Sequence, residues 1–152
     1  MKFKKVVSVK ASLAEVWALL DDLETVAHCI PGLGEYSEVN AQEFDSVLVH
    51  RVGPVKARFE LKTRIVDIEH EKSLTLVSEG RESHLDSWVK ANLDFTLAPN
   101  GDSIDIDISA EFSVTGRVGT FGQRIISTKA EQVVLQAMRN IDEVLERRRS
   151  NQ

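Results

Sequence analysis

Three long stretches of the chain alternate between apolar and polar residues with a period of two. They are VKARFELKTRI from residue 55, SWVKANLDFTL from residue 87 and SIDIDISAEFSV from residue 103. Successive side chains of a strand point to opposite faces, so each stretch predicts a strand with one dry and one wet face. The dry positions include Phe59, Leu61, Ala91, Leu93 and Phe112.

Shorter stretches of strand character occupy residues 2–10, 35–40, 44–53 and 73–80. Turn signals lie between the stretches, among them Gly53-Pro54 and Asn100-Gly101. Strands joined by short turns form antiparallel hairpins, whereas parallel strands need crossover helices that the pattern lacks. The sequence therefore predicts seven antiparallel strands.

Two short helices are predicted after the first strand. Ser12 and Glu15 have the spacing of a capping box before LAEVWALL, and LETVAHCI can form a second helix that ends at Pro31. The stretch HCIPGLGEY that follows, residues 28–36, raises the question of a reactive loop beside Cys29. Its proline and glycines favour a corner that turns the chain into the sheet.

A long helix is predicted from about Gly119 to Arg148. Its apolar stripe ends in bulky residues such as Met138 and Leu145, while Gly119, Gln123, Ser127 and Ala130 are small or polar. Two interpretations of this contrast stay open. The sheet can leave a cavity opposite the small residues, or Phe59, Phe112 or Trp88 can fill the space. Trp17 and Trp88 are both expected in the core or in the wall of a cavity.

Together these elements indicate an α+β fold. We expect a helix-grip arrangement, with a seven-stranded curved antiparallel sheet, two short helices after the first strand, and a long C-terminal helix packed across the sheet. No linker or internal repeat interrupts the order, so residues 1–150 are expected to form one ligand-binding domain.

Composition excludes several classes of protein. The formal net charge is -5 at pH 7, which argues against a nucleic-acid binder. One cysteine excludes an intramolecular disulfide framework, and the first residues lack the apolar run of a signal peptide. We therefore expect a cytoplasmic protein with at most peripheral contact at the inner face of the membrane.

Catalytic chemistry has little support in the sequence. The histidines lack metal-ligand spacing, so no metal is expected, and Cys29 is more typical of buried packing than of a nucleophile. The glycines of GRVGTFGQ, residues 116–123, do not have the spacing of a phosphate-binding loop. Titratable residues of the long strands fall on the wet face, namely Lys62, Arg64, Lys90, Asp94, Asp105 and Asp107.

Three stretches carry a resemblance to a known family. HCIPGLGEY, VGPVKARFELKTRIVDIE and GRVGTFGQRIISTKAEQV occur in the order found in the CoxG subunits of carbon monoxide dehydrogenase. This family lies within the START-like (SRPBCC), helix-grip superfamily, which also contains polyketide cyclases and proteins of the birch pollen allergen type. The resemblance implies an apolar pocket between sheet and helix, and an association with molybdenum-containing hydroxylases, membranes and a lipophilic electron carrier such as a quinone.

The resulting expectation is a non-enzymatic module that binds a lipophilic small molecule, such as a quinone, as an accessory protein of a molybdenum hydroxylase. The expected cavity is lined from the sheet by Phe59, Leu61, Ala91, Leu93 and Phe112, and from the helix by Gln123, Ile126, Ser127 and Ala130. Gln123 and Ser127 would orient a carbonyl. Two alternatives stay open: an enzyme of the cyclase or hydrolase kind that uses the same cavity, and an assembly protein with a filled core.

Overall fold

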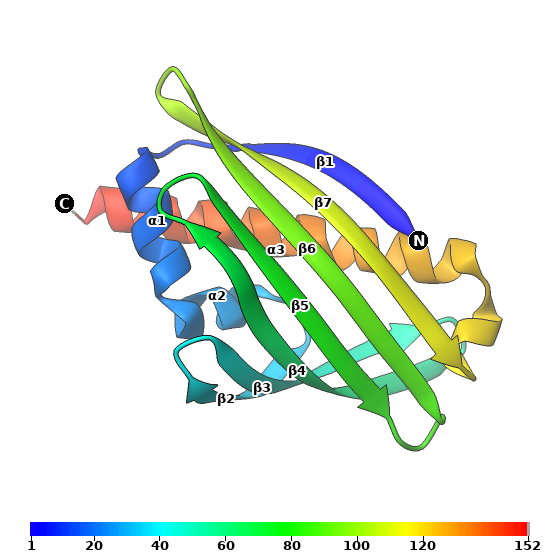
Figure 1. Cartoon of the computed structure of the whole chain (residues 1–152). Helices are drawn as coiled ribbons and strands as arrows, with labels where there is room; N and C mark the ends of the chain where they lie inside the picture. Colours follow the sequence, from blue (N-terminus) through cyan, green and yellow to red (C-terminus); the bar gives the residue numbers. More distant parts are fainter. Residues whose placement is uncertain (152) are drawn as a thin grey trace.

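The computed structural model describes residues 1–151, and its backbone is dominated by one sheet of seven antiparallel strands (Figure 1). The strands are β1 (Lys2–Val9), β2 (Leu33–Asn40), β3 (Glu43–Val52), β4 (Val55–Glu69), β5 (Ser73–Glu82), β6 (Ser87–Asn100) and β7 (Ser103–Gly116). Their order across the sheet is β1-β7-β6-β5-β4-β3-β2. Every connection except that from β1 joins neighbouring strands, which confirms the predicted meander.

Two short helices, α1 (Leu13–Asp21) and α2 (Leu23–Cys29), separate β1 from β2. The predicted capping box opens α1: the backbone N–H of Glu15 donates to Ser12 Oγ at 3.1 Å, and the Ser12 N–H donates to Glu15 Oε1 at 2.9 Å. Val16 and Trp17 of α1 are buried, as the sequence predicted for Trp17.

The last helix begins later than the sequence predicted. A short 3₁₀ helix, η1 (Val118–Phe121), comes first, and α3 spans Gln123–Ser150. Gly122 lies between them at a φ of 100°, a left-handed conformation that interrupts the helix and that glycine adopts without strain. The expected start at Gly119 is therefore wrong, because the chain turns once more before α3.

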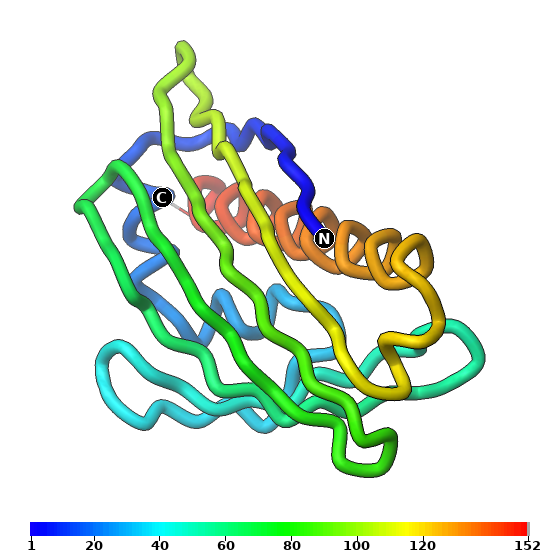
Figure 2. Tube along the Cα trace, turned by 45° about the vertical axis from the view of Figure 1, so that its right-hand side comes forward, coloured from blue at the N-terminus to red at the C-terminus, as the bar shows by residue number. Residues whose placement is uncertain are grey.

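The sheet curves around α3, which crosses its concave side (Figures 1 and 2). The alternation predicted from the sequence is preserved in the register. Lys62, Lys90 and Asp94 lie on the outer face, whereas Ala57 and Phe59 of β4 are buried on the inner face. Most of the inward side chains of β7 are also buried, which places the core between the sheet and the helices.

Candidate functional site

The core between sheet and helices consists of two separate apolar clusters. The first joins α1, the C-terminal half of α3 and one end of β7, and includes Leu19, Ile108 and Leu145. The second joins the β3–β4 hairpin, β7, η1 and the first turns of α3, and includes Phe59, Phe112 and Ile126. Leu76 and Leu93, in the centre of the concave face, belong to neither cluster and are only half-buried.

Small side chains occupy the middle of this concave face. Thr63 of β4, Ser78 of β5 and Ala91 of β6 are directly opposite one another in the register, and Ser78 and Ala91 are half-buried. Across from the sheet, Ser127 and Ala130 of α3 are also small and half-buried. We call the half-buried concave surface of Leu61, Leu76, Ser78, Ala91 and Leu93 the concave apolar face.

The nine residues expected to line the cavity fall into three groups. Phe59, Phe112 and Ile126 are buried in the second cluster, and Leu61, Ala91 and Ala130 pack against it half-buried. Leu93 and Ser127 are half-buried outside it. Gln123 is exposed at the first turn of α3. The structure thus brings six of the nine together at one end of the concave apolar face.

The concave face also carries polar groups that the sequence interpretation did not select. Thr63 Oγ1 and Ser78 Oγ lie 2.9 Å apart and share a hydrogen bond, and Ser46 is 4% exposed. When one of the two hydroxyls donates to the other, the hydrogen of the second stays available. Thr63 and Ser78 both occupy inward positions of their strands. Such positions predict apolar packing, so the sequence pattern did not point to a polar contact here.

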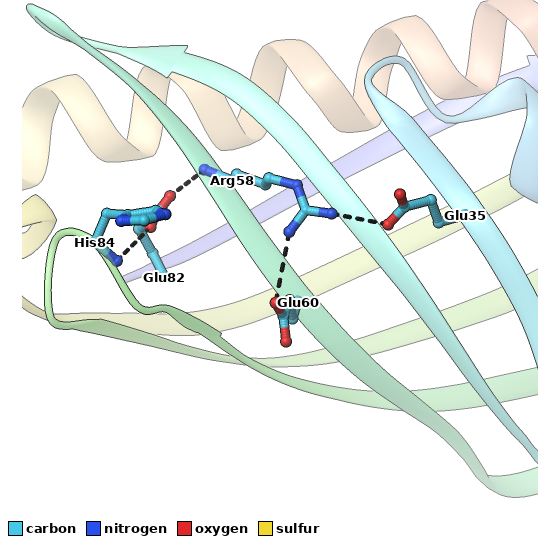
Figure 3. Close-up of polar contacts among 5 residues, drawn as sticks. All are labelled: Glu35, Arg58, Glu60, Glu82 and His84. Carbon is cyan, nitrogen blue, oxygen red and sulfur yellow. Dashed lines mark hydrogen bonds and ion pairs between the residues drawn. The ribbon is translucent and has the colours of Figure 1, made fainter.

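One carboxylate is buried on the inner side. Glu82, at the end of β5, is 2% exposed, and its Oε1 accepts the backbone N–H of His84 at 2.9 Å. Its Oε2 accepts the backbone N–H of Arg58, as Figure 3 shows. The β4–β5 ladder ends at the pair Glu60 and Arg81, so Glu82 provides an acceptor where the backbone of β5 no longer does. Both of its oxygens accept from backbone amides, and within residues 1–151 no imidazole is paired with it.

Arg58 extends outward from the same position. Its guanidinium donates to Glu35 at 2.9 Å and to Glu60 at 3.5 Å on the exposed side of the sheet (Figure 3). These groups therefore stabilise the strands from outside and do not reach the concave apolar face.

The other titratable candidates have structural partners. Burial raises the pKa of the Cys29 thiol, which disfavours the thiolate that a nucleophile needs. His28 is exposed, and its Nδ1 lies 2.7 Å from the carbonyl oxygen of Glu24 one turn earlier. Among residues 1–151, no cluster of three or more His, Cys, Asp or Glu side chains is placed to hold a metal ion.

One hollow lies on the outer face of the sheet and not on the concave side. It has a volume of about 860 Å³ and is lined mainly by charged residues of β4 to β6 together with Trp88. Trp88 is 47% exposed, and the Cζ atom of the Arg81 guanidinium lies 5.4 Å from the centre of its ring. The expectation that Trp88 lies in the core or in the wall of an inner cavity is therefore wrong, because it occupies a wet position of β6.

Within residues 1–151, no helix is both long enough and apolar enough to cross a bilayer. The longest, α3, carries charged residues along its length.

Comparisons with known proteins agree with this geometry. Residues 6–146 match the family model that describes the CoxG subunit of carbon monoxide dehydrogenase. A search of curated protein sequences finds no match.

Three solved structures illustrate the similarity of fold. A conserved protein from Geobacillus kaustophilus is 20% identical with a TM-score of 0.89, covering 97% of this chain and 96% of that one. A START superfamily protein from Mycobacterium smegmatis is 14% identical with a TM-score of 0.74, covering 96% and 97%. The Zhui aromatase/cyclase from a Streptomyces species is 11% identical with a TM-score of 0.72, covering 97% and 94%. At these identities the likeness demonstrates a START-like helix-grip fold.

Proposed function

This chain belongs to the CoxG family of carbon monoxide dehydrogenase subunits, and we propose that its concave apolar face binds a lipophilic small molecule. The protein would act as a non-enzymatic accessory of a molybdenum hydroxylase of the carbon monoxide dehydrogenase type. The single observation that carries the binding proposal is the half-burial of Leu61, Leu76 and Leu93 on the inner side of a sheet that a helix covers.

Half-buried leucines on an inner surface remain partly hydrated. Removing apolar surface from water contributes about 25 cal/mol for each Å² buried. A flat ring or a prenyl chain between this surface and α3 would cover Leu76 and Leu93, which neither core cluster covers. The small residues Ala91 and Ala130 would leave the space that such a molecule needs.

Orientation of the ligand would come from the hydroxyl pair of Thr63 and Ser78. The hydroxyl hydrogen that their mutual bond leaves free can donate to a carbonyl oxygen. A quinone suits this arrangement, since it combines an apolar ring with carbonyl acceptors. Of the two residues first expected to do this, Gln123 is exposed and Ser127 is half-buried.

The accessory role is supported by the family's description, which names CoxG as a component of carbon monoxide dehydrogenase. The enzyme alternative, which the Zhui aromatase/cyclase suggests through its fold, finds less support. It needs a free acid or base beside the ligand, and both oxygens of Glu82 are occupied by backbone amides.

The proposal is tested by titrating the purified protein with a short-chain quinone and measuring binding by calorimetry. Ala130→Phe should abolish binding and leave the melting temperature nearly unchanged, because the new ring occupies the ligand's space. Glu143→Phe, which puts the same ring on the exposed side of α3, should bind as the original protein does.

A result that would contradict the proposal is equally clear. If the original protein binds no quinone and Ala130→Phe lowers the free energy of unfolding by about 1–3 kcal/mol through overpacking, the space is filled. The alternative of an assembly protein would then replace the binding proposal. Ser78→Ala with Thr63→Val tests orientation separately, since these changes should weaken a quinone more than an alkyl chain without carbonyls.

A further inference from the structure

Five basic residues gather at the end of the molecule where α3 begins. Arg51 and Lys56 flank the β3–β4 turn, Arg117 precedes η1, and Arg124 and Lys129 lie on the first turns of α3. Figures 1 and 2 show the β3–β4 turn and the start of α3 at the same end. The two also lie close together, because a Cβ atom added to Gly53 in the β3–β4 turn would lie 3.8 Å from the ring of Phe121 in η1. We call these five residues the basic end.

The charges of the basic end are uncompensated. Within residues 1–151 none of the five forms an ion pair, although the chain as a whole has a formal charge of -5. The nearest carboxylates in sequence have other partners: Asp45 pairs with Lys62 at 3.9 Å, Glu60 with Arg58 at 3.5 Å, Glu111 with Lys2 at 4.0 Å and Glu131 with Lys5 at 2.7 Å.

Two of these charges also repel each other across the β3–β4 hairpin. Arg51 and Lys56 are directly opposite each other in the β3–β4 register, and both are exposed. Like charges in cross-strand positions destabilise a hairpin. An anionic partner at this hairpin would turn that repulsion into attraction.

A hollow of about 310 Å³ lies beside these charges. It is lined by Gly53, Arg124, Ile125, Thr128, Lys129 and Gln132, and none of these residues is acidic. Ile125 is 45% exposed. A hollow with one aliphatic contact and a cationic rim is suited to an apolar side chain that carboxylates flank.

We propose that the basic end is a docking site for an acidic segment of a partner protein, which inserts one large apolar side chain into the hollow beside Ile125. A protein segment fits better than a bilayer surface. Membrane-surface helices present a broad apolar face, whereas within residues 1–151 Ile125 is the single large hydrophobic residue of α3 that is strongly exposed. The proposal is independent of what the concave apolar face binds.

The test uses a synthetic peptide with one leucine flanked by glutamates on both sides, added to isotopically labelled full-length protein. Amide NMR shifts should change at Gly53, Ile125 and Lys129 in a saturable manner, and the affinity should fall as salt is raised. Arg124→Glu should weaken binding about tenfold, since it reverses one rim charge. Replacing the leucine of the peptide by alanine should also weaken binding about tenfold.

Arg139→Glu is the matched control, because Arg139 is exposed on α3 outside the hollow and donates to Gln136 on its own helix. It should leave the affinity unchanged. Vesicles of phosphatidylcholine with phosphatidylglycerol form the second arm of the experiment. The proposal is overturned if the peptide causes no saturable shifts, if Arg139→Glu weakens binding as much as Arg124→Glu, or if the anionic vesicles bind at these residues while the peptide does not.

Discussion

The imidazole Nε2 of His50 lies 2.6 Å from the carbonyl oxygen of Pro31. Because a carbonyl can only accept, Nε2 carries the hydrogen and donates it. This bond joins β3 to the corner between α2 and β2, and the Val49 N–H strengthens the connection by donating to Gly32 O at 2.9 Å. The stretch HCIPGLGEY is therefore a corner attached to the sheet, as its proline and glycines indicated.

Loss of the His50 side chain should destabilise this corner. We expect His50→Ala to lower the free energy of unfolding by about 1–2 kcal/mol, since the Pro31 carbonyl loses its donor in a half-buried position. Urea denaturation followed by circular dichroism measures the change. His28→Ala is the control and should stay within about 0.5 kcal/mol, because His28 is exposed. Equal effects of the two substitutions would contradict this role for His50.

The two glycines of the corner should respond differently to alanine. Gly32 has a φ of 81°, and an added Cβ would lie 2.4 Å from Val49 O and 2.7 Å from His50 Nε2. Gly32→Ala should therefore cost about 2–4 kcal/mol, by strain and by displacement of the His50 bond. Gly34 has no atom within 4 Å of an added Cβ, so Gly34→Ala should be neutral or stabilise by up to about 1 kcal/mol. Thermal melting of both variants checks the order.

Removal of the buried Glu82 carboxylate should weaken the contact between β4 and the end of β5. Glu82→Ala leaves the amides of Arg58 and His84 without their acceptor, and we expect a loss of about 2–4 kcal/mol. Glu82→Gln keeps one acceptor oxygen and should lose less. Hydrogen exchange of the Arg58 and His84 amides should accelerate in both variants. Glu60→Ala, on the exposed face of β4, should leave both amides protected, and acceleration there would argue against a specific role for Glu82.

The raised pKa of Tyr36 predicts how the free energy of unfolding changes at high pH. Its burial, and then its hydrogen bond to Glu38 at 3.1 Å, raise its pKa from 10.0 to about 12. The folded state therefore favours the neutral phenol. The contribution of Tyr36 to the free energy of unfolding is fully present below pH 10, where the phenol of the unfolded chain also stays protonated. It is lost as the pH rises toward about 12.

The chain has one tyrosine, so tyrosinate absorbance reports this group alone. Titration of the folded protein should have its midpoint near 12, and titration in urea near 10. The difference in stability between the original protein and Tyr36→Phe should shrink over this range of pH. A folded-state midpoint equal to that in urea would show that Tyr36 is hydrated and not bonded to Glu38.

Local features of the sequence determined most of the fold. Alternation in β4, β6 and β7 placed Phe59, Ala91 and Phe112 on the inner side, because the strand period leaves only two faces for a side chain. The Ser12 and Glu15 pair fixed the start of α1 through bonds within one turn. Short turns then allowed only a meander, and the family resemblance pointed to the same fold.

Features that depend on contacts between distant elements were decided by the tertiary structure. Glu82 looks like an ordinary strand-end carboxylate in the sequence, and only the divergence of β5 from β4 makes its oxygens the acceptors for Arg58 and His84. The size of Trp88 favours a place in the core, yet the register of β6 places it outside. The burial of Glu82 depends on what lies opposite its side chain, which the local pattern does not contain, whereas the outward position of Trp88 follows from the alternation of its own strand.

The same distinction applies to the sites. Leu61, Ala91 and Leu93 of the concave apolar face were selected from periodicity, since they share one side of the sheet. Leu76 and Ser78 of β5 were not selected. The pairing of Thr63 with Ser78 and the gathering of five basic residues at one end could not be predicted from periodicity, because each joins residues from separate strands or helices. The sequence determined which face each residue would present, and only the folded arrangement decided which residues would meet there.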